Sequence, residues 1–247
     1  MMEVEFKEAD LFKRIMDTVG SLMSDVSLDF TDKGLSIKAM DPANIAMIIF
    51  EGGKGLFDTF NVEKDTKLSV SLDDLNGILK LLKKDDKLKL TDSKNRLNLD
   101  IVGKNKLHFT ISLIDENYTA QKIPQLKFSA EATLLSSLVK DAIKAGFLVD
   151  DSLYMTIDGH RMILSARSEE KEFSEDVSIN ENKEIFNIKS DALTRSKYSI
   201  EYMTKFLNAM DPDKPVKFSF SNNYPLRIDY ELGPNANMSF ILANRIE

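Results

Sequence analysis

The sequence predicts an α+β fold built from two similar halves. The order of expected elements is the same in each: strand, helix, hairpin, strand, short strand, helix, three strands. Gly34 and Gly159 correspond in the hairpin turns, 125 residues apart, and Ser71 and Ser199 correspond at helix starts, 128 residues apart. The two helices of each half must cover their apolar faces, so we expect a duplicated unit of helices on a largely antiparallel sheet.

The first half begins with a strand and a helix and ends with three strands. Apolar residues recur at helical spacing in residues 11–22 and 72–84. Ser71 is a suitable N-cap for the second helix, with Asp73 and Asp74 in the first turn, where carboxylates complement the helix dipole. Apolar alternation or short apolar runs predict strands at residues 4–6, 28–30, 35–39, 45–50, 67–70, 87–91, 96–101 and 106–114.

The second half repeats this pattern. Helical spacing of apolar residues returns in residues 134–145 and 199–210, and Pro212 and Pro215 end the later helix. Strands are predicted at residues 128–130, 153–157, 162–166, 173–179, 185–188, 216–220, 226–230 and 238–242.

Residues 114–127 have neither a helical nor a strand period. They follow a strongly alternating strand and precede the second set of elements. We therefore expect domains at residues 1–114 and 128–247, joined by a connector at residues 115–127.

Composition excludes several classes of protein. The chain of 247 residues is 43% hydrophobic and 30% charged, which is typical of a chain that forms a core. It has no cysteine, so disulfides and thiolate metal sites are excluded. The N-terminus is acidic where a signal peptide is basic, and no apolar run approaches the roughly 20 residues of a membrane span. We expect an intracellular protein with no membrane contact.

The net charge of −7 argues against nucleic-acid binding, but its distribution is uneven. The four helix windows together carry +3, which leaves −10 for the remainder. Two explanations stay open. The helix lysines are ordinary solubilising residues, or they form a weak, sequence-independent surface for phosphates.

The sequence offers no convincing catalytic constellation, metal site or cofactor motif. The glycine-rich run at residues 52–55 lacks the spacing of a phosphate loop, and Ser137 and Lys140 match a nucleophile motif only by their separation. His108 and His160 have no evident partners. A hydrolase using scattered acids is the remaining enzymatic hypothesis.

Several stretches resemble proliferating cell nuclear antigen, the sliding clamp of archaeal and eukaryotic DNA replication. They are LSIKAMDPANIAM at residues 35–47, ILK at 78–80, KIP at 122–124, YPLRIDY at 224–230 and FILANRIE at 240–247. The resemblance spans the whole chain. It implies a duplicated two-domain DNA clamp fold, in which three subunits form a ring with helices lining the hole and sheets outside. It implies a processivity factor for DNA polymerase and not an enzyme.

The resemblance also implies residues that face duplex DNA. The matching positions are Lys13, Arg14, Lys80 and Lys140; Lys83, Lys84, Lys144 and Lys205 are added from the expected helix faces. Three residues stand where the family often has basic ones, Gly20, Glu201 and Asn208, so the lining is expected to be less positive than usual.

A docking site for short peptide motifs is implied as well. Its residues are Met40, Asn44, Ile45, Met47, Ile123, Pro124, Pro225, Ile241, Leu242 and Ala243. DNA polymerase, clamp loader, DNA ligase and flap endonuclease are the expected partners. Two residues depart from the family pattern, Gln121 and Asn244. An alternative explanation for three of the docking residues, Met40, Ile45 and Ile241, is that they are simply part of the core.

Subunits in this family pair through two edge strands, expected here at residues 106–114 and 172–179. Acids on the second edge and basic residues on the first are compatible with a homotrimer or with a heterotrimer of paralogues. A subunit of a related heterotrimeric DNA-damage checkpoint clamp is the alternative function. The expected location is the cytoplasm, or the nucleus in a eukaryote.

Overall fold

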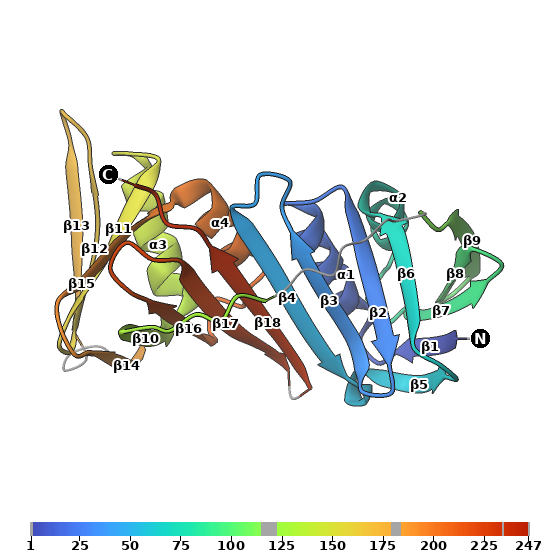
Figure 1. Cartoon of the computed structure of the whole chain (residues 1–247). Coiled ribbons are helices and arrows are strands. Elements are labelled where there is room, and N and C mark those ends of the chain that lie inside the picture. The colour runs from blue at the N-terminus through green and yellow to red at the C-terminus, as the bar shows by residue number, and fades with distance from the viewer. Residues whose placement is uncertain (1, 115–122, 179–183, 234, 247) are drawn as a thin grey trace. The chain divides into compact units, whose positions relative to one another are not determined.

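The computed structural model describes residues 2–114, 123–178, 184–233 and 235–246 (Figure 1). The chain divides into two compact units. The first comprises Met1–Pro42, Ile48–Lys122 and Glu231–Met238, and the second comprises Ala43–Met47, Ile123–Tyr230 and Ser239–Glu247. Residues 115–122 of the expected connector (115–127), which include Gln121, lie outside the described residues.

The described residues of the first unit form two helices and strands of two sheets. Its elements are β1 (Met2–Phe6), α1 (Ala9–Gly20), β2 (Asp25–Thr31), β3 (Gly34–Met40), most of β4 (Ala46–Gly53), the 3₁₀ turn η1 (Lys54–Leu56), β5 (Phe57–Val62), β6 (Thr66–Ser71), α2 (Leu72–Leu79), β7 (Lys87–Ser93), β8 (Arg96–Val102) and β9 (Lys106–Ser112). One sheet has the order β5-β1-β7-β8-β9, and β3, β2 and β6 are neighbours in the other. Helices α1 and α2 lie side by side against the sheet of β2, β3 and β6 (Figure 1).

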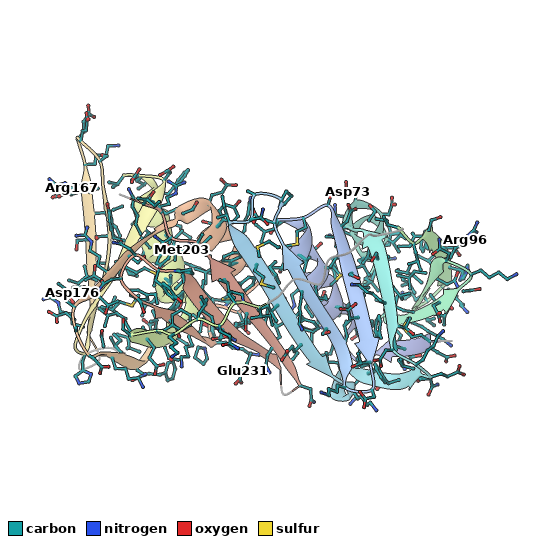
Figure 2. The ribbon with its side chains drawn as sticks, viewed as in Figure 1. Asp73, Arg96, Arg167, Asp176, Met203 and Glu231 are labelled. Atoms are coloured by element: carbon teal, nitrogen blue, oxygen red, sulfur yellow. The ribbon has the colours of Figure 1, made fainter. Side chains whose placement is uncertain are left out.

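The second unit repeats this plan. Its elements are β10 (Ala130–Leu135), α3 (Ser136–Phe147), β11 (Ser152–Asp158), β12 (Arg161–Arg167), β13 (Glu172–Ser178), β14 (Ile185–Ser190), β15 (Thr194–Ser199), α4 (Ile200–Asn208), β16 (Pro215–Phe220), most of β17 (Leu226–Gly233) and the end of β18 (Ala236–Leu242). One sheet has the order β13-β12-β11-β15, and β14, β10, β16 and β17 are neighbours in the other. Met203 on α4 is fully buried among the side chains of this unit (Figure 2).

Strand pairing confirms the duplication. Strand β1 pairs with β5 and β7, as β10 pairs with β14 and β16. Strand β2 lies between β3 and β6, as β11 lies between β12 and β15. The glycines predicted for the hairpin turns both have positive φ, 136° at Gly34 and 59° at Gly159. A Cβ atom on Gly34 would also stand 2.1 Å from the carbonyl oxygen of Gly52, so glycine is required there.

Apolar alternation predicts neither β5 nor β15, one strand in each half. Strand β15 lacks the pattern because its alternating buried positions are Thr194, Ser196 and Tyr198 rather than aliphatic residues. Their hydroxyl groups are paired inside the fold; for example, the Tyr198 hydroxyl donates to the Tyr224 carbonyl at 2.8 Å. A polar strand can therefore face a core when its donors find acceptors.

Two helix predictions were wrong at their ends. Leu134 and Leu135 belong to β10, and α3 starts at Ser136. Helix α2 stops at Leu79 rather than at residue 84, because the following amides of Leu81 and Leu82 bond three residues back to Ile78 and Leu79. This tighter turn ends the α-helical ladder although the apolar spacing continues.

No helix in the described part of the chain is long and apolar enough to cross a membrane.

Candidate functional site

The helix cations expected to face DNA lie at the surface, and several of them are already paired with acids. Arg14 lies 3.7 Å from Asp10 on α1. On α3, Lys144 lies 2.8 Å from Asp141. On α4, Lys205 lies 2.7 Å from Glu201. Exposed pairs of this kind contribute little to stability, but each places an acid beside the predicted phosphate-binding cation.

Lys140 has a different environment from the other helix lysines. Its ammonium donates to the Met210 carbonyl at 2.8 Å and is half-buried. Burial lowers the pKa of Lys140, while nearby Asp211 opposes the change. The side chain therefore bridges α3 to the end of α4, which occupies one of its three donors.

Lys80, Lys83 and Lys84 do not lie on a helix face as expected. Lys80 is the C-cap of α2, and Lys83 and Lys84 follow in a turn. All three are exposed. Their side chains make no ion pair with any described residue, and the same holds for half-buried Lys13 on α1. These four lysines are thus the least neutralised cations of the predicted set.

The expected excess of positive charge on the helices is wrong. With the observed bounds, α1 has two acids and two bases, α2 has two acids, α3 has two lysines and one aspartate, and α4 has one of each. The helices therefore carry −1 rather than +3. The difference arises mainly because Lys80, Lys83 and Lys84 lie beyond the end of α2.

Nine of the ten predicted docking residues belong to the second unit; Met40 belongs to the first. Asn44, Ile45, Ile123 and Pro124 are exposed, and Pro225 and Ala243 are half-buried. Met47, Ile241 and Leu242 are buried, which fits a core role for these three side chains. The amide of Ala243 donates to the Ile45 carbonyl at 2.8 Å, so two distant docking segments meet.

Exposure distinguishes the two explanations given for the apolar docking residues. Ile45 is 39% exposed and Ile123 is 36% exposed, which is unusual for large aliphatic side chains in a core. Ile241, at 7%, behaves as a core residue. Ile45 and Ile123 therefore offer the apolar surface that a peptide side chain can cover.

The C-terminal segment is held by an ion pair between residues far apart in the sequence. The guanidinium of Arg245 contacts the carboxylate of Asp151 and donates to the Ser152 hydroxyl at 2.7 Å. The hydrogen bond from Arg245 lowers the pKa of Asp151 to about 2. The partners are 94 residues apart, so no local pattern could have revealed the pair.

Strands β9 and β13 are the last strands of their sheets, as expected for a subunit interface. Their charges are largely used within the chain. Asp100 accepts from His108 at 2.8 Å and lies 3.5 Å from Lys106. On the other edge Arg161 donates to Asp176 at 2.7 Å, and Arg167 lies 3.0 Å from Glu172. Arg167 and Asp176 point outward from their strands (Figure 2). Residue 179, also expected on this edge, lies outside the described residues.

His108 lies between a carboxylate and a hydroxyl, an order that occurs in hydrolases. Its Nδ1 faces Asp100, and its Nε2 lies 3.4 Å from the Thr110 hydroxyl. The hydroxyl donates instead to Oδ1 of Asn98 at 2.8 Å, on an exposed strand. The described residues also contain no group of three or more side chains that could hold a metal ion. This geometry gives no support to the hydrolase hypothesis.

The described parts of the two units have matching topology, and each has two helices against its sheets and an edge strand. This architecture is that of a DNA-clamp subunit. The family model for the N-terminal domain of proliferating cell nuclear antigen matches residues 1–119. DNA polymerase sliding clamps from Pyrococcus furiosus and Thermofilum pendens are each 28% identical to the chain. The matches cover 99% and 100% of the chain and 98% and 100% of those proteins.

Solved structures agree. A proliferating cell nuclear antigen of Thermococcus kodakaraensis has a TM-score of 0.94 at 23% identity, covering 99% of this chain and all of that one, which supports the fold. The PCNA2–PCNA3 complex of Sulfolobus tokodaii matches with a TM-score of 0.89 at 28% identity, over all of both chains. A. fulgidus PCNA, solved with the C-terminal region of FEN-1 bound, matches with a TM-score of 0.89 at 25% identity, over 100% and 99%. These matches support a sliding clamp of the proliferating cell nuclear antigen family.

Proposed function

We propose that the chain is one subunit of a three-membered ring that encircles duplex DNA and tethers replication and repair enzymes to it. The observation that carries this proposal is the end-to-end match to DNA polymerase sliding clamps, together with the duplicated units. In this proposal, residues 1–114 and 128–247 are the two clamp domains and residues 115–127 connect them. Pairing of β9 with β13 of the next subunit closes the ring and covers both open edges.

Weak contacts suit a ring. Sequence-independent DNA binding has a Kd on the order of 10⁻⁴–10⁻⁶ M and falls with salt. Topology retains a closed ring on DNA, so the lining needs only to tolerate phosphates while it slides. The small net charge of the helices agrees with this. The cations without an ion-pair partner in the described part of the chain are Lys13, Lys80, Lys83 and Lys84. The paired cations Arg14, Lys144 and Lys205, with Lys140, contribute less.

The second part of the proposal is a docking site for short peptides. An aromatic and aliphatic plug would cover exposed Ile45 and Ile123, with Asn44, Pro124, Pro225 and Ala243 of the same unit around it. The A. fulgidus relative that holds a FEN-1 segment supports this use of the fold. DNA polymerase, clamp loader, DNA ligase and flap endonuclease are the proposed partners. The chain acts without catalysis of its own and inside the cell.

Retention on circular DNA tests the ring. The protein is loaded by its clamp loader onto a nicked plasmid, and the complex is separated by gel filtration before and after linearisation. We expect the protein to stay on the circle and to be lost from the linear DNA in high salt. Equal retention on both forms, or none on either, would contradict encirclement.

The S. tokodaii complex contains two different clamp subunits, which keeps a heterotrimer with paralogues within the proposal. Light scattering of this chain alone distinguishes a homotrimer from a subunit that needs paralogues.

A further inference from the structure

Strand β15 presents two cations beside an aromatic ring. The guanidinium carbon of Arg195 lies 4.2 Å from the ring centroid of Tyr154, and the ammonium of Lys197 lies 5.2 Å from it. Lys197 is directly opposite Tyr154 in the pairing of β11 with β15. A guanidinium over an aromatic face is held in place while its N–H donors remain available at its edge. The ring therefore orients Arg195 without neutralising it.

Two acids lie near this group. Asp151 contacts Arg245, and Asp150 lies 4.0 Å from Lys197, so an acid of the chain offsets part of the Lys197 charge. Arg195 is exposed and makes no ion pair with any described residue. Its guanidinium is thus an oriented cation that has no anion within the described part of the chain.

The two cations lie between segments that carry proposed docking residues. The carbonyl of Arg195 accepts from the amide of Asn223 at 3.3 Å, two residues before Pro225. The carbonyl of Lys197 accepts from the amide of Arg245 at 2.8 Å, two residues after Ala243. Strand β15 is therefore anchored on its open side by the Pro225 segment and by the C-terminal segment. The backbone that carries both cations is thus bonded directly to the two segments that hold Pro225 and Ala243.

We propose that Tyr154, Arg195 and Lys197 form a second contact for docked peptides, which binds acidic side chains flanking the apolar plug. A carboxylate takes two parallel hydrogen bonds from a guanidinium, and Lys197 adds a second positive charge. This inference rests on the docking function proposed above. It goes further by assigning a charge preference to the flanking part of the partner peptide.

Fluorescence anisotropy tests this with two labelled synthetic peptides. Both carry the same aromatic and aliphatic plug; one has three aspartates on each side of the plug and the other has serines there. Binding is measured at low and at physiological salt. We expect the aspartate peptide to bind the unmodified protein about three- to tenfold more tightly at low salt, with a smaller advantage at higher salt.

The double variant Arg195→Gln/Lys197→Gln should remove this advantage and leave the affinity for the serine peptide unchanged. Lys189→Gln is the matched control, because Lys189 is an exposed lysine in the other sheet of the same unit, 2.9 Å from Glu131. It should leave the aspartate advantage intact.

The outcomes separate the two proposals. Equal affinity of the unmodified protein for both peptides, or an advantage that survives in the double variant, overturns the acidic preference while docking stands. Failure of both peptides to bind overturns docking itself. A labelled DNA duplex that loses affinity in the double variant, while the peptides are not distinguished, assigns the cations to nucleic acid and overturns the inference.

Discussion

Asn76 places its side-chain amide 2.5 Å from where a Cβ atom on Gly20 would stand. The same amide donates to the Met16 carbonyl at 3.1 Å and so joins α2 to α1. A residue larger than glycine would have to displace this amide from its acceptor. The family often has a basic residue at this position, and here the close approach of two helices favours glycine.

Gly20→Ala is therefore expected to lower the free energy of unfolding by about 1–2 kcal/mol, as expected for a disrupted hydrogen bond at a tight contact. This is the opposite of the roughly 1 kcal/mol gain that alanine usually brings to a helix. Urea unfolding at a fixed subunit concentration measures the change.

Gly77→Ala is the matched control, because a Cβ atom on Gly77 meets nothing within 4 Å. It should raise stability by about 0.5–1 kcal/mol. In an Asn76→Ala background the penalty at Gly20 should disappear. The same loss in both backgrounds would show that Asn76 is not its cause.

Release of the C-terminal segment should depend on pH through Asp151. Arg245 depresses the pKa of Asp151 to about 2, below its ordinary value near 3.9. A depressed carboxyl pKa stabilises the fold above the unfolded value and ceases to do so as pH falls. The pair should therefore hold the segment above about pH 4 and weaken between about pH 4 and 2. Asp151 is exposed and Arg245 is half-buried, so solvent screens the pair and its effect on global stability is small.

Hydrogen exchange of the Arg245 amide is the sensitive measurement, because that amide donates to Lys197 at 2.8 Å. Asp151→Asn should speed its exchange at neutral pH about two- to fivefold, which corresponds to one exposed ion pair. Glu169→Gln, an exposed acid in a loop of the same unit, should leave the rate unchanged. An unchanged rate in Asp151→Asn would refute the anchoring role.

Ile123→Asp is expected to weaken binding of a plug-bearing peptide at least tenfold, because a carboxylate would be buried against an apolar side chain. Titration calorimetry measures the affinity, and light scattering checks that assembly is unaffected. Phe186→Asp is the control, since Phe186 is 57% exposed on β14 and outside the proposed site. Unaltered peptide affinity in Ile123→Asp would remove Ile123 from the docking surface.

Unpaired lysines should contribute more to DNA contact than paired ones. Lys80→Gln is expected to reduce the salt dependence of DNA affinity by about one unit of logarithmic slope, the value for one lost phosphate contact. Lys205→Gln should change it less, because Glu201 lies 2.7 Å from that ammonium. Equal effects of the two substitutions on the slope would show that the ion pair of Lys205 with Glu201 opens when DNA binds. Binding to a short duplex at several salt concentrations gives the slopes.

Periodicity predicted most of the fold, because most buried positions are aliphatic and alternate or recur at helical spacing. It failed where a core position is polar, as at Ser196 on β15, and where a helix ended without a break in apolar spacing, as at Leu79. Hydrogen bonds of the folded chain explain both failures: those of the buried hydroxyl groups on β15, and those that tighten the turn after α2.

The contacts at the candidate sites are also of two kinds. The pairing of Glu201 with Lys205 is predictable from the sequence, because the two residues are four positions apart on one helix. The contact of Arg195 with Tyr154 and that of Arg245 with Asp151 join distant segments, so only the folded chain reveals them.

Ring formation by three subunits is measured by light scattering coupled to gel filtration at micromolar concentration. We expect a particle of three times the 28.0 kDa subunit mass, formed by this chain alone or with its paralogues. A particle that stays at 28.0 kDa in every mixture would contradict it.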